Sequence, residues 1–337
     1  MDWFERLTGF KEGPFRATQS RLEVRDQLLC SRVNGRCYGI GSLELPTLRD
    51  LRAATRGKLG NGRLRVSSAS GDVGGMHRLP QNEGALFQVA SQFNLLEMIG
   101  PEVTPEDGVT RYQRDLTQGP ACAMAAGAAT IYRNYFAPVR DQIGQTAKFQ
   151  LDAAADLRNA LAQRVGTEAN SIWEVRNGYA LAYRNGLDQV NGWLRQATSA
   201  EIDEIRETLR IGLHVDVEVT DADASPGPIV SQAFCSAMPV SYSSVDPDAW
   251  APVAKLVLES AYEATLHAAV LQAARGRSSR VLLTQLGGGA FGNEEHWIDG
   301  AIRRALRLFA KTDLEVVLVS FGAPSQATVQ LVRDFSA

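Results

Sequence analysis

A run of glycines near the end of the chain has the spacing of an anion-binding loop. The segment LLTQLGGGAFGNEEHW places Gly287, Gly288, Gly289 and Gly292 between an apolar stretch and a predicted helix. Glycines allow successive backbone N–H groups to turn toward an anion, and the start of a helix adds partial positive charge. The pattern therefore predicts a phosphate-binding loop, with Asn293 as the N-cap of the helix that follows.

The same loop matches the dinucleotide fingerprint GxGxxG at Gly287, Gly289 and Gly292. A nicotinamide-binding unit needs an acidic residue at the end of the next strand, whereas Asp313 stands at the start of LEVVLVSFG. Only 45 residues follow the loop, too few for the rest of a doubly wound half-domain. An NAD-dependent oxidoreductase is thus the second interpretation, and a glycine-rich turn without a ligand is a third.

Carboxylates that could perform acid–base chemistry lie in the polar stretch PEVTPEDGVTRYQRDLTQGP. Asp107 and Asp115 could divide the work, because one carboxylate can activate water while another stabilises a departing cation. Their spacing does not place them on one face of a helix, so solvated loop aspartates are the alternative. Gln113 could bond ligand hydroxyls, and Glu97 could face the same site or simply begin a helix.

Composition excludes several classes of function. The chain has 337 residues, with 35 basic and 38 acidic side chains and a formal net charge of −3. A binder that relies on nucleic-acid phosphates should show a basic excess, so no nucleic-acid partner is expected. No apolar run approaches the roughly 20 residues of a membrane span. The N-terminus lacks the apolar core of a secretory signal, so we expect a cytoplasmic protein, with secretion by another route left open.

The four cysteines are scattered rather than arranged as a disulfide scaffold. Cys30 and Cys37 could pair or share a metal, but no further ligands stand nearby, and the expectation is reduced, mostly buried thiols, with Cys122 and Cys235 among them. The four histidines show no metal-ligand spacing. No metal site and no cofactor is predicted.

Strand and helix patterns alternate along the chain and predict an α/β layered fold with largely parallel central strands. Turn residues at Asn34-Gly35 predict a hairpin, and a second hairpin is expected within 171–186. The expected strands are 64–73, 85–94, 214–221, 229–243, 280–286 and 314–322. The expected helices include 121–136, 249–275 and 294–311.

The order of these motifs resembles that of a macrodomain, the ADP-ribose-binding α/β/α fold. Gly71-Asp72-Val73 is similar to the family's Gly-Asp-Ile turn, whose aspartate holds the adenine amino group. Asn94 matches the asparagine that orients the distal ribose. Gly289-Ala290-Phe291-Gly292 matches the Gly-x-Phe/Tyr-Gly phosphate loop, with Phe291 in the place of the aromatic residue that covers that ribose.

The resemblance covers roughly 64–325 and implies a three-layer α/β/α sandwich with a mixed, largely parallel central sheet. It divides the chain into an N-terminal extension, 1–63, packed on the core and a macrodomain-like catalytic domain, 64–337. Helical patterning predicts an insertion in that domain at about 140–211.

One departure from the family pattern suggests a particular chemistry. The triple-glycine loop that usually follows the ribose-orienting asparagine is replaced here by a longer, acidic stretch. In this the chain resembles the divergent MavL-type branch, which removes ADP-ribose from an arginine of ubiquitin. The implied partners are ADP-ribose and an ADP-ribosylated protein, with ubiquitin as the first candidate. A non-catalytic ADP-ribose reader is the alternative.

The resemblance also assigns site residues. The implied catalytic residues are Asp107, Asp115 and Asn94. The implied ADP-ribose-binding residues are Asp72, Val73, Gln113, Gly287, Gly288, Gly289, Ala290, Phe291, Gly292 and Asn293.

Overall fold

The computed structural model describes residues 1–336 and is built around one seven-stranded sheet. The strands, in spatial order, are β4 (Ser42–Glu44), β11 (Gly212–Glu218), β12 (Ile229–Cys235), β6 (Leu86–Ala90), β13 (Arg280–Leu283), β14 (Glu315–Ser320) and β5 (Arg65–Ser70). The last five run parallel to one another, whereas β11 is antiparallel to both of its neighbours. The predicted mixed, largely parallel sheet is confirmed.

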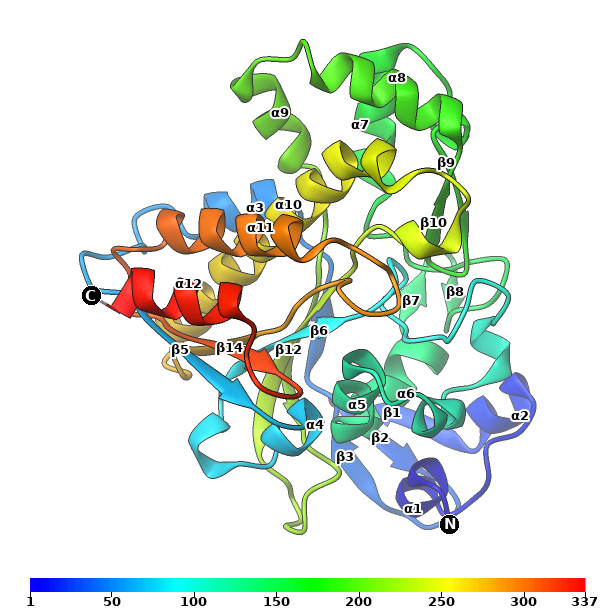
Figure 1. Ribbon diagram of the computed structural model, residues 1–337. Helices are drawn as coiled ribbons and strands as arrows, with labels where there is room; N and C mark the ends of the chain where they lie inside the picture. The colour runs from blue at the N-terminus through cyan, green and yellow to red at the C-terminus, as the bar shows by residue number, and fades with distance from the viewer. Residues whose placement is uncertain (337) are drawn as a thin grey trace.

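Helices cover both faces of this sheet, as Figure 1 shows. One layer consists of α3 (Leu48–Ala54), α10 (Pro247–Ala274), α11 (Glu295–Leu308) and α12 (Gln326–Ser336). The opposite layer contains α4 (Val73–Met76), α5 (Gln118–Ala125) and α6 (Gly127–Tyr135). The predicted three-layer α/β/α sandwich is confirmed.

The prediction of one continuous helix over 121–136 is wrong, because the chain breaks at Ala126 between α5 and α6. Thr220, which follows β11, competes for the helical hydrogen bonds there. Its hydroxyl accepts from the Gly127 N–H at 2.8 Å, and its own N–H donates to the Ala125 carbonyl at 2.9 Å. The break leaves α5 and α6 as two short helices on this face of the sheet.

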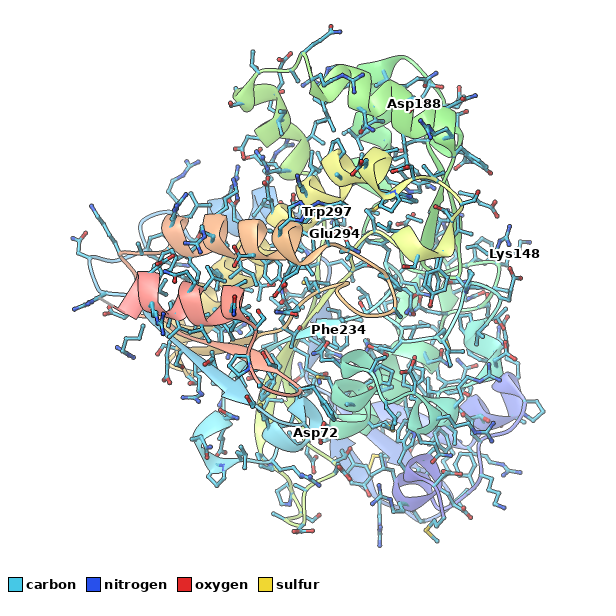
Figure 2. The ribbon with its side chains drawn as sticks, viewed as in Figure 1. Asp72, Lys148, Asp188, Phe234, Glu294 and Trp297 are labelled. Atoms are coloured by element: carbon cyan, nitrogen blue, oxygen red, sulfur yellow. A yellow bond between two sulfur atoms is a disulfide. The ribbon has the colours of Figure 1, made fainter. Side chains whose placement is uncertain are left out.

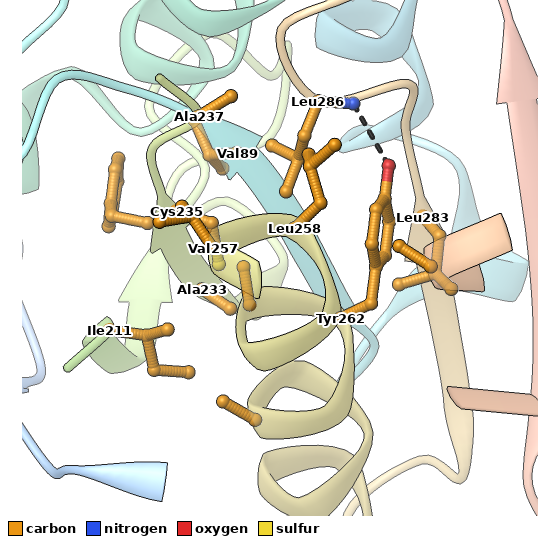
Figure 3. Packing of buried hydrophobic residues seen from close by; sticks show 14 of the residues in the cluster. Val89, Ile211, Ala233, Cys235, Ala237, Val257, Leu258, Tyr262, Leu283 and Leu286 are labelled. Atoms are coloured by element: carbon orange, nitrogen blue, oxygen red, sulfur yellow. Dashed lines mark hydrogen bonds between the residues drawn. The ribbon is translucent and has the colours of Figure 1, made fainter. Parts of the chain in front are cut away.

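Burial on both faces explains the composition of the central elements. Strand β6 reads LFQVA and is almost entirely buried, as expected for a parallel strand covered by helices on both sides. Helix α10 is buried around most of its circumference because it packs on the sheet and is flanked by α3, α8 and α11. Figure 3 shows its Val257, Leu258 and Tyr262 against strand residues of the sheet.

The predicted N-terminal extension forms its own small layer and also completes the central sheet. It contains α1 (Trp3–Thr8), α2 (Phe15–Ser20) and the three-stranded sheet β1 (Leu22–Arg25), β2 (Leu28–Ser31) and β3 (Cys37–Gly39). A second apolar cluster, which includes Phe4, Leu96 and Ile131, joins this layer to α6 and the loop after β6. Strand β4, from the same extension, pairs with β11.

The expectation of reduced thiols is wrong for two of the four cysteines. Cys30 and Cys37 form a disulfide, while Cys122 and Cys235 are free and buried. The physical reason is the predicted hairpin itself, because strands β2 and β3 pair with Cys30 directly opposite Cys37. Two thiols at facing positions of a hairpin have their Cβ atoms close enough to bond.

Residues 140–211, for which a helical insertion is predicted, contain β8 (Gln142–Ile143), α7 (Ala155–Val165), β9 (Trp173–Arg176), β10 (Tyr179–Ala182), α8 (Arg184–Leu194) and α9 (Ser199–Arg206). In Figure 1, α7, α8 and α9 lie beside the start of α10, whereas β8 pairs with β7 (Pro138–Val139) near α6. Apolar side chains of α7 and α8, such as Leu157 and Leu187, belong to the same buried cluster as the central sheet. Strands β9 and β10 form the hairpin expected within 171–186. No helix within residues 1–336 has the length and apolar character needed to cross a membrane.

Candidate functional site

A cavity of about 740 Å³ opens where the parallel strands end. Its wall includes residues that follow five different strands: Asp72 after β5, Gln92 after β6, Ala237 after β12, Gly287 after β13 and Phe321 after β14. The carboxyl ends of parallel strands meet at one edge of a sheet, where ligands of open α/β sheets bind. The volume lies within the roughly 300–1,000 Å³ usual for small-molecule sites.

The glycine loop after β13 forms one side of this cavity. The Asn293 N–H donates to the Gly287 carbonyl at 2.9 Å and closes the loop, with Gly287 at a φ of 71°. Within the described part of the chain, the N–H groups of Gly289, Ala290 and Phe291 have no hydrogen-bond partner, and all three residues line the cavity. Consecutive unpaired N–H groups are the feature that an anion requires.

Three predicted loop residues shape the loop rather than line the cavity. Gly288 and Gly292 are absent from the wall, and a Cβ at Gly292 would lie 1.9 Å from the Ser241 Oγ. The prediction that Asn293 caps the helix is wrong, because α11 starts one residue later and Glu294 occupies the N-cap. Asn293 instead donates its side-chain N–H to the Met238 carbonyl at 2.8 Å.

A buried tyrosine anchors the junction between β13 and the glycine loop. The Tyr262 hydroxyl donates to the Thr284 carbonyl at 2.6 Å and accepts from the Leu286 N–H at 3.0 Å, the bond drawn in Figure 3. Tyr262 is completely buried in α10. One side chain therefore fixes the two ends of the turn from which the loop departs.

We expect Tyr262→Phe to lower the free energy of unfolding by about 0.5–1.5 kcal/mol, because the Thr284 carbonyl and the Leu286 N–H each lose one hydrogen bond but keep the 3.0 Å bond that joins them. Urea denaturation measures the difference. Tyr183→Phe is the matched control, because Tyr183 is half exposed and its hydroxyl makes only a 3.4 Å bond to Glu174. Equal stability of the Tyr262→Phe variant and the native protein would contradict the anchoring role.

An aromatic cluster lines the cavity beside the glycine loop. The Phe291 ring lies 5.4 Å from the Tyr179 ring and 5.6 Å from the Tyr242 ring, measured between centroids. All three line the cavity, and the Tyr179 hydroxyl donates to the Met98 carbonyl at 2.7 Å. Tyr179 comes from β10 in the insertion and Tyr242 from the loop after β12. Sequence reasoning missed both because no local pattern connects them to the loop.

Asp72 and Val73 both line the cavity at the end of β5, and Figure 2 shows Asp72 next to α4. Asp72 is the N-cap of α4, and its two carboxylate oxygens accept from the Gly74 and Gly75 N–H groups at 3.0 and 2.9 Å. Each carboxylate oxygen keeps a second lone pair, so a ligand amino group could still donate to it.

The two predicted catalytic aspartates lie in different surroundings. Asp115 lines the cavity, and its Oδ1 accepts from the Thr117 N–H at 2.9 Å. Asp107 does not line it. Its Oδ2 accepts from the N–H and the hydroxyl of Thr104, both at 2.9 Å, and these bonds hold the pKa of Asp107 below its usual range. The capping box keeps this carboxylate turned back on its own loop.

Asn94 and Gln113 also lie outside the cavity wall. Asn94 is completely buried, donates to the Gln150 side chain at 2.7 Å and accepts from the Leu96 N–H at 3.1 Å. It therefore ties the loop after β6 to the insertion. Gln113 is exposed and lines a separate, smaller hollow beside α1.

The deepest acid at the cavity is Glu97, which sequence reasoning mentioned only in passing. It lines the cavity although its side chain is only 1% exposed. Its Oε1 is 3.4 Å from the Nη2 of the fully buried Arg133, and its Oε2 has no hydrogen-bond partner. Burial raises the pKa of Glu97 to about 7, against the opposing effect of Arg133.

No protein-family model matches the sequence, and no curated protein matches it. Among solved structures, poly(ADP-ribose) glycohydrolase from Deinococcus radiodurans in complex with ADP-ribose is 14% identical with a TM-score of 0.47, and the alignment covers 87% of this chain and 93% of that one. The enzyme from Thermomonospora curvata bound to the inhibitor ADP-HPD is 15% identical with a TM-score of 0.41, covering 94% of both chains.

Proposed function

We propose that this protein is an ADP-ribosylhydrolase that removes ADP-ribose from an arginine of a modified protein, with ubiquitin as the first substrate to try. The observation that carries the proposal is the cavity at the strand ends, where unpaired N–H groups, an aromatic cluster and a carboxylate meet. The sequence resemblance to macrodomains supports the choice of ADP-ribose as the ligand.

Each part of the ligand has a proposed place in this cavity. The pyrophosphate binds the unpaired N–H groups of the glycine loop, the distal ribose packs on Phe291, and the adenine amino group donates to Asp72. Asp115 is the carboxylate next to the arginine. Asp107 and Asn94 act as positioning residues, because their hydrogen bonds hold the loop that carries Asp115.

The oxidoreductase interpretation receives less support from the geometry. Strand β14 ends at Ser320, followed by Phe321 and Gly322, so no acidic residue stands where a nicotinamide dinucleotide would place its adenosine ribose. Asp313 precedes β14 and lies at the opposite end of the sheet from the cavity. An ADP-ribose reader shares the proposed binding mode and differs only in lacking turnover.

We expect calorimetry to show binding of ADP-ribose, and Gly289→Val to weaken it about tenfold or more, since the side chain would cover the unpaired N–H groups. A Cβ at Gly289 meets nothing within 4 Å, so the loop itself should survive. Gly300→Val is the matched control, because that glycine is equally open but lies on the exposed face of α11. Equal affinity of both variants would contradict the assignment of the loop.

Turnover is tested by incubating the protein with arginine-linked and glutamate-linked ADP-ribosyl proteins and measuring released ADP-ribose. Release from the arginine linkage supports the hydrolase. Binding of ADP-ribose without release from either linkage favours the reader. Binding of NAD with hydride transfer, and no affinity for ADP-ribose, favours the oxidoreductase.

A further inference from the structure

We propose that Glu97 is the general base of this site, the group that takes a proton from the attacking water. The inference rests on the proposed hydrolase function and adds a catalytic residue to it. Three observations carry it: Glu97 belongs to the cavity wall, its side chain is almost completely withdrawn from bulk solvent, and its Oε2 lacks any partner in the described part of the chain.

Glu97 lies at the depth in the cavity where the attacking water is expected. A modified protein can present its arginine only from outside, so the leaving guanidine must face the cavity mouth. Water that attacks from the opposite side of the ribose must then come from deeper in the cavity. Asp115 is partly exposed and Glu97 is buried, so the two carboxyl groups stand at the two depths that such a displacement requires.

Neighbouring elements hold Glu97 rigidly. Its backbone N–H donates to the Tyr112 hydroxyl at 3.0 Å. The first turn of α5 presses on its side chain, where a Cβ on Gly119 would lie 3.2 Å from the Glu97 Cγ. Arg133 binds only the Oε1, which leaves the Oε2 available to water that enters the cavity. A base fixed in this way loses little conformational entropy in the transition state.

The proposed step balances without a co-reactant. The water oxygen bonds to the ribose C1 while the bond from C1 to the guanidine nitrogen breaks, its electron pair passing to that nitrogen. One water proton passes to the Glu97 carboxylate, and the guanidine, which departs on the opposite side of the ribose, takes a proton from solvent at the cavity mouth and leaves as guanidinium. Glu97 then gives its proton to water. The carboxylate is thereby restored for the next turnover.

The titratable groups around Glu97 set the pH at which it can act. Burial, the largest effect, raises the pKa of Glu97 to about 7, while Arg133 from α6 and the Tyr112 hydroxyl lower it. Burial also raises the pKa values of Tyr112 and Cys122 and lowers that of His214, so these three are neutral near pH 7. Only Glu97 among them changes charge in this range, and turnover should rise with pH up to a plateau above about 7.

The test measures kcat on an arginine-linked ADP-ribosyl protein from pH 5 to 9. We expect Glu97→Gln to lower kcat about 10²-fold or more and to abolish the rise with pH, while the affinity for ADP-ribose changes less than about threefold. Glu97→Asp keeps the charge beside Arg133 and should fold even if Glu97→Gln does not. It should retain the rise with pH at a kcat at least about tenfold lower.

Glu263→Gln is the matched control, because Glu263 is also buried and paired with arginines, Arg52 and Arg304, but lies outside the cavity wall. Its pH profile should remain native. A native kcat in folded Glu97→Asp, or an unchanged pH profile in folded Glu97→Gln, would overturn the role of Glu97 alone. A native protein that cleaves no ADP-ribosyl linkage would overturn the hydrolase function and, with it, the general base.

Discussion

Asp115→Ala is expected to lower the rate of ADP-ribose release from an arginine-linked substrate about 10²-fold or more, with ADP-ribose affinity largely retained. The departing guanidine and the cationic ribose both gain from a nearby carboxylate, and a positioned carboxylate commonly contributes this much. Asp115→Asn should lose as much, because the amide keeps the shape and the bond to the Thr117 N–H but not the charge. Single-turnover release of ADP-ribose is the measurement.

Two other aspartates, Asp107 and Asp141, provide controls for the Asp115 variants. Asp107→Ala should lose less than about tenfold in rate, because Asp107 lies outside the cavity and acts only through the loop it caps. Asp141→Ala, at an exposed turn between β7 and β8, should behave as native. The assignment fails if both Asp115 variants cleave at the native rate. A loss for Asp107→Ala equal to that for Asp115→Ala would show that the two carboxylates act as a pair.

Features encoded in adjacent residues could be predicted from the sequence. The strand-loop-helix pattern around the glycines located the loop, because glycine adopts the positive φ of Gly287 most readily and a Cβ there would lie 2.5 Å from the Ala237 Cβ. The alternation of strands and helices gave the layered fold. The same pattern failed for Asn293, whose side chain bonds a carbonyl of the loop after β12 rather than its own helix. A contact 55 residues away leaves no local trace.

The remaining site depends on contacts that only the folded chain creates. Glu97 becomes a buried acid because Arg133, 36 residues later, and the start of α5 enclose it. The sequence does not show which of Asp107 and Asp115 faces the cavity. In the structure the Asp107 carboxylate accepts a hydrogen bond from the Thr104 N–H, which turns it back on its own loop. The disulfide likewise depends on the register that the hairpin adopts in the folded chain, which places Cys30 opposite Cys37.

The buried ion pair behind the cavity should matter most for stability. Arg133 is completely buried, with its guanidinium 3.8 Å from the centre of the Phe234 ring, and its Nε donates to the Leu95 carbonyl at 3.1 Å. Removing one partner of a buried pair usually costs about 3–5 kcal/mol, since the other charge is left uncompensated. We therefore expect Arg133→Met to lower the free energy of unfolding by about that amount at pH 8, measured by urea denaturation.

The loss of stability caused by Arg133→Met should be smaller at acidic pH, because Glu97 is protonated there. Its pKa in the folded protein already stands at about 7, above the roughly 4.3 of an unfolded chain, so ionising it between these values destabilises the fold as pH rises. Without Arg133 the folded pKa rises further, so Arg133→Met should be closer to native stability at pH 5 than at pH 8. In the double variant Arg133→Met, Glu97→Gln, the uncompensated carboxylate is gone. Its free energy of unfolding at pH 8 should therefore be higher than that of Arg133→Met alone.

An exposed pair provides the contrast for this prediction. Arg184 bonds Asp188 one helical turn away, with both side chains more than half exposed, so Arg184→Met should cost no more than about 0.5 kcal/mol and show no dependence on pH between 5 and 8. A similarly small and pH-independent loss in Arg133→Met would mean that Glu97 needs no buried counter-charge. Glu97 would then be protonated, and so uncharged, in the folded protein at pH 7. A protonated Glu97 could not take a proton from water, so it could not serve as the general base.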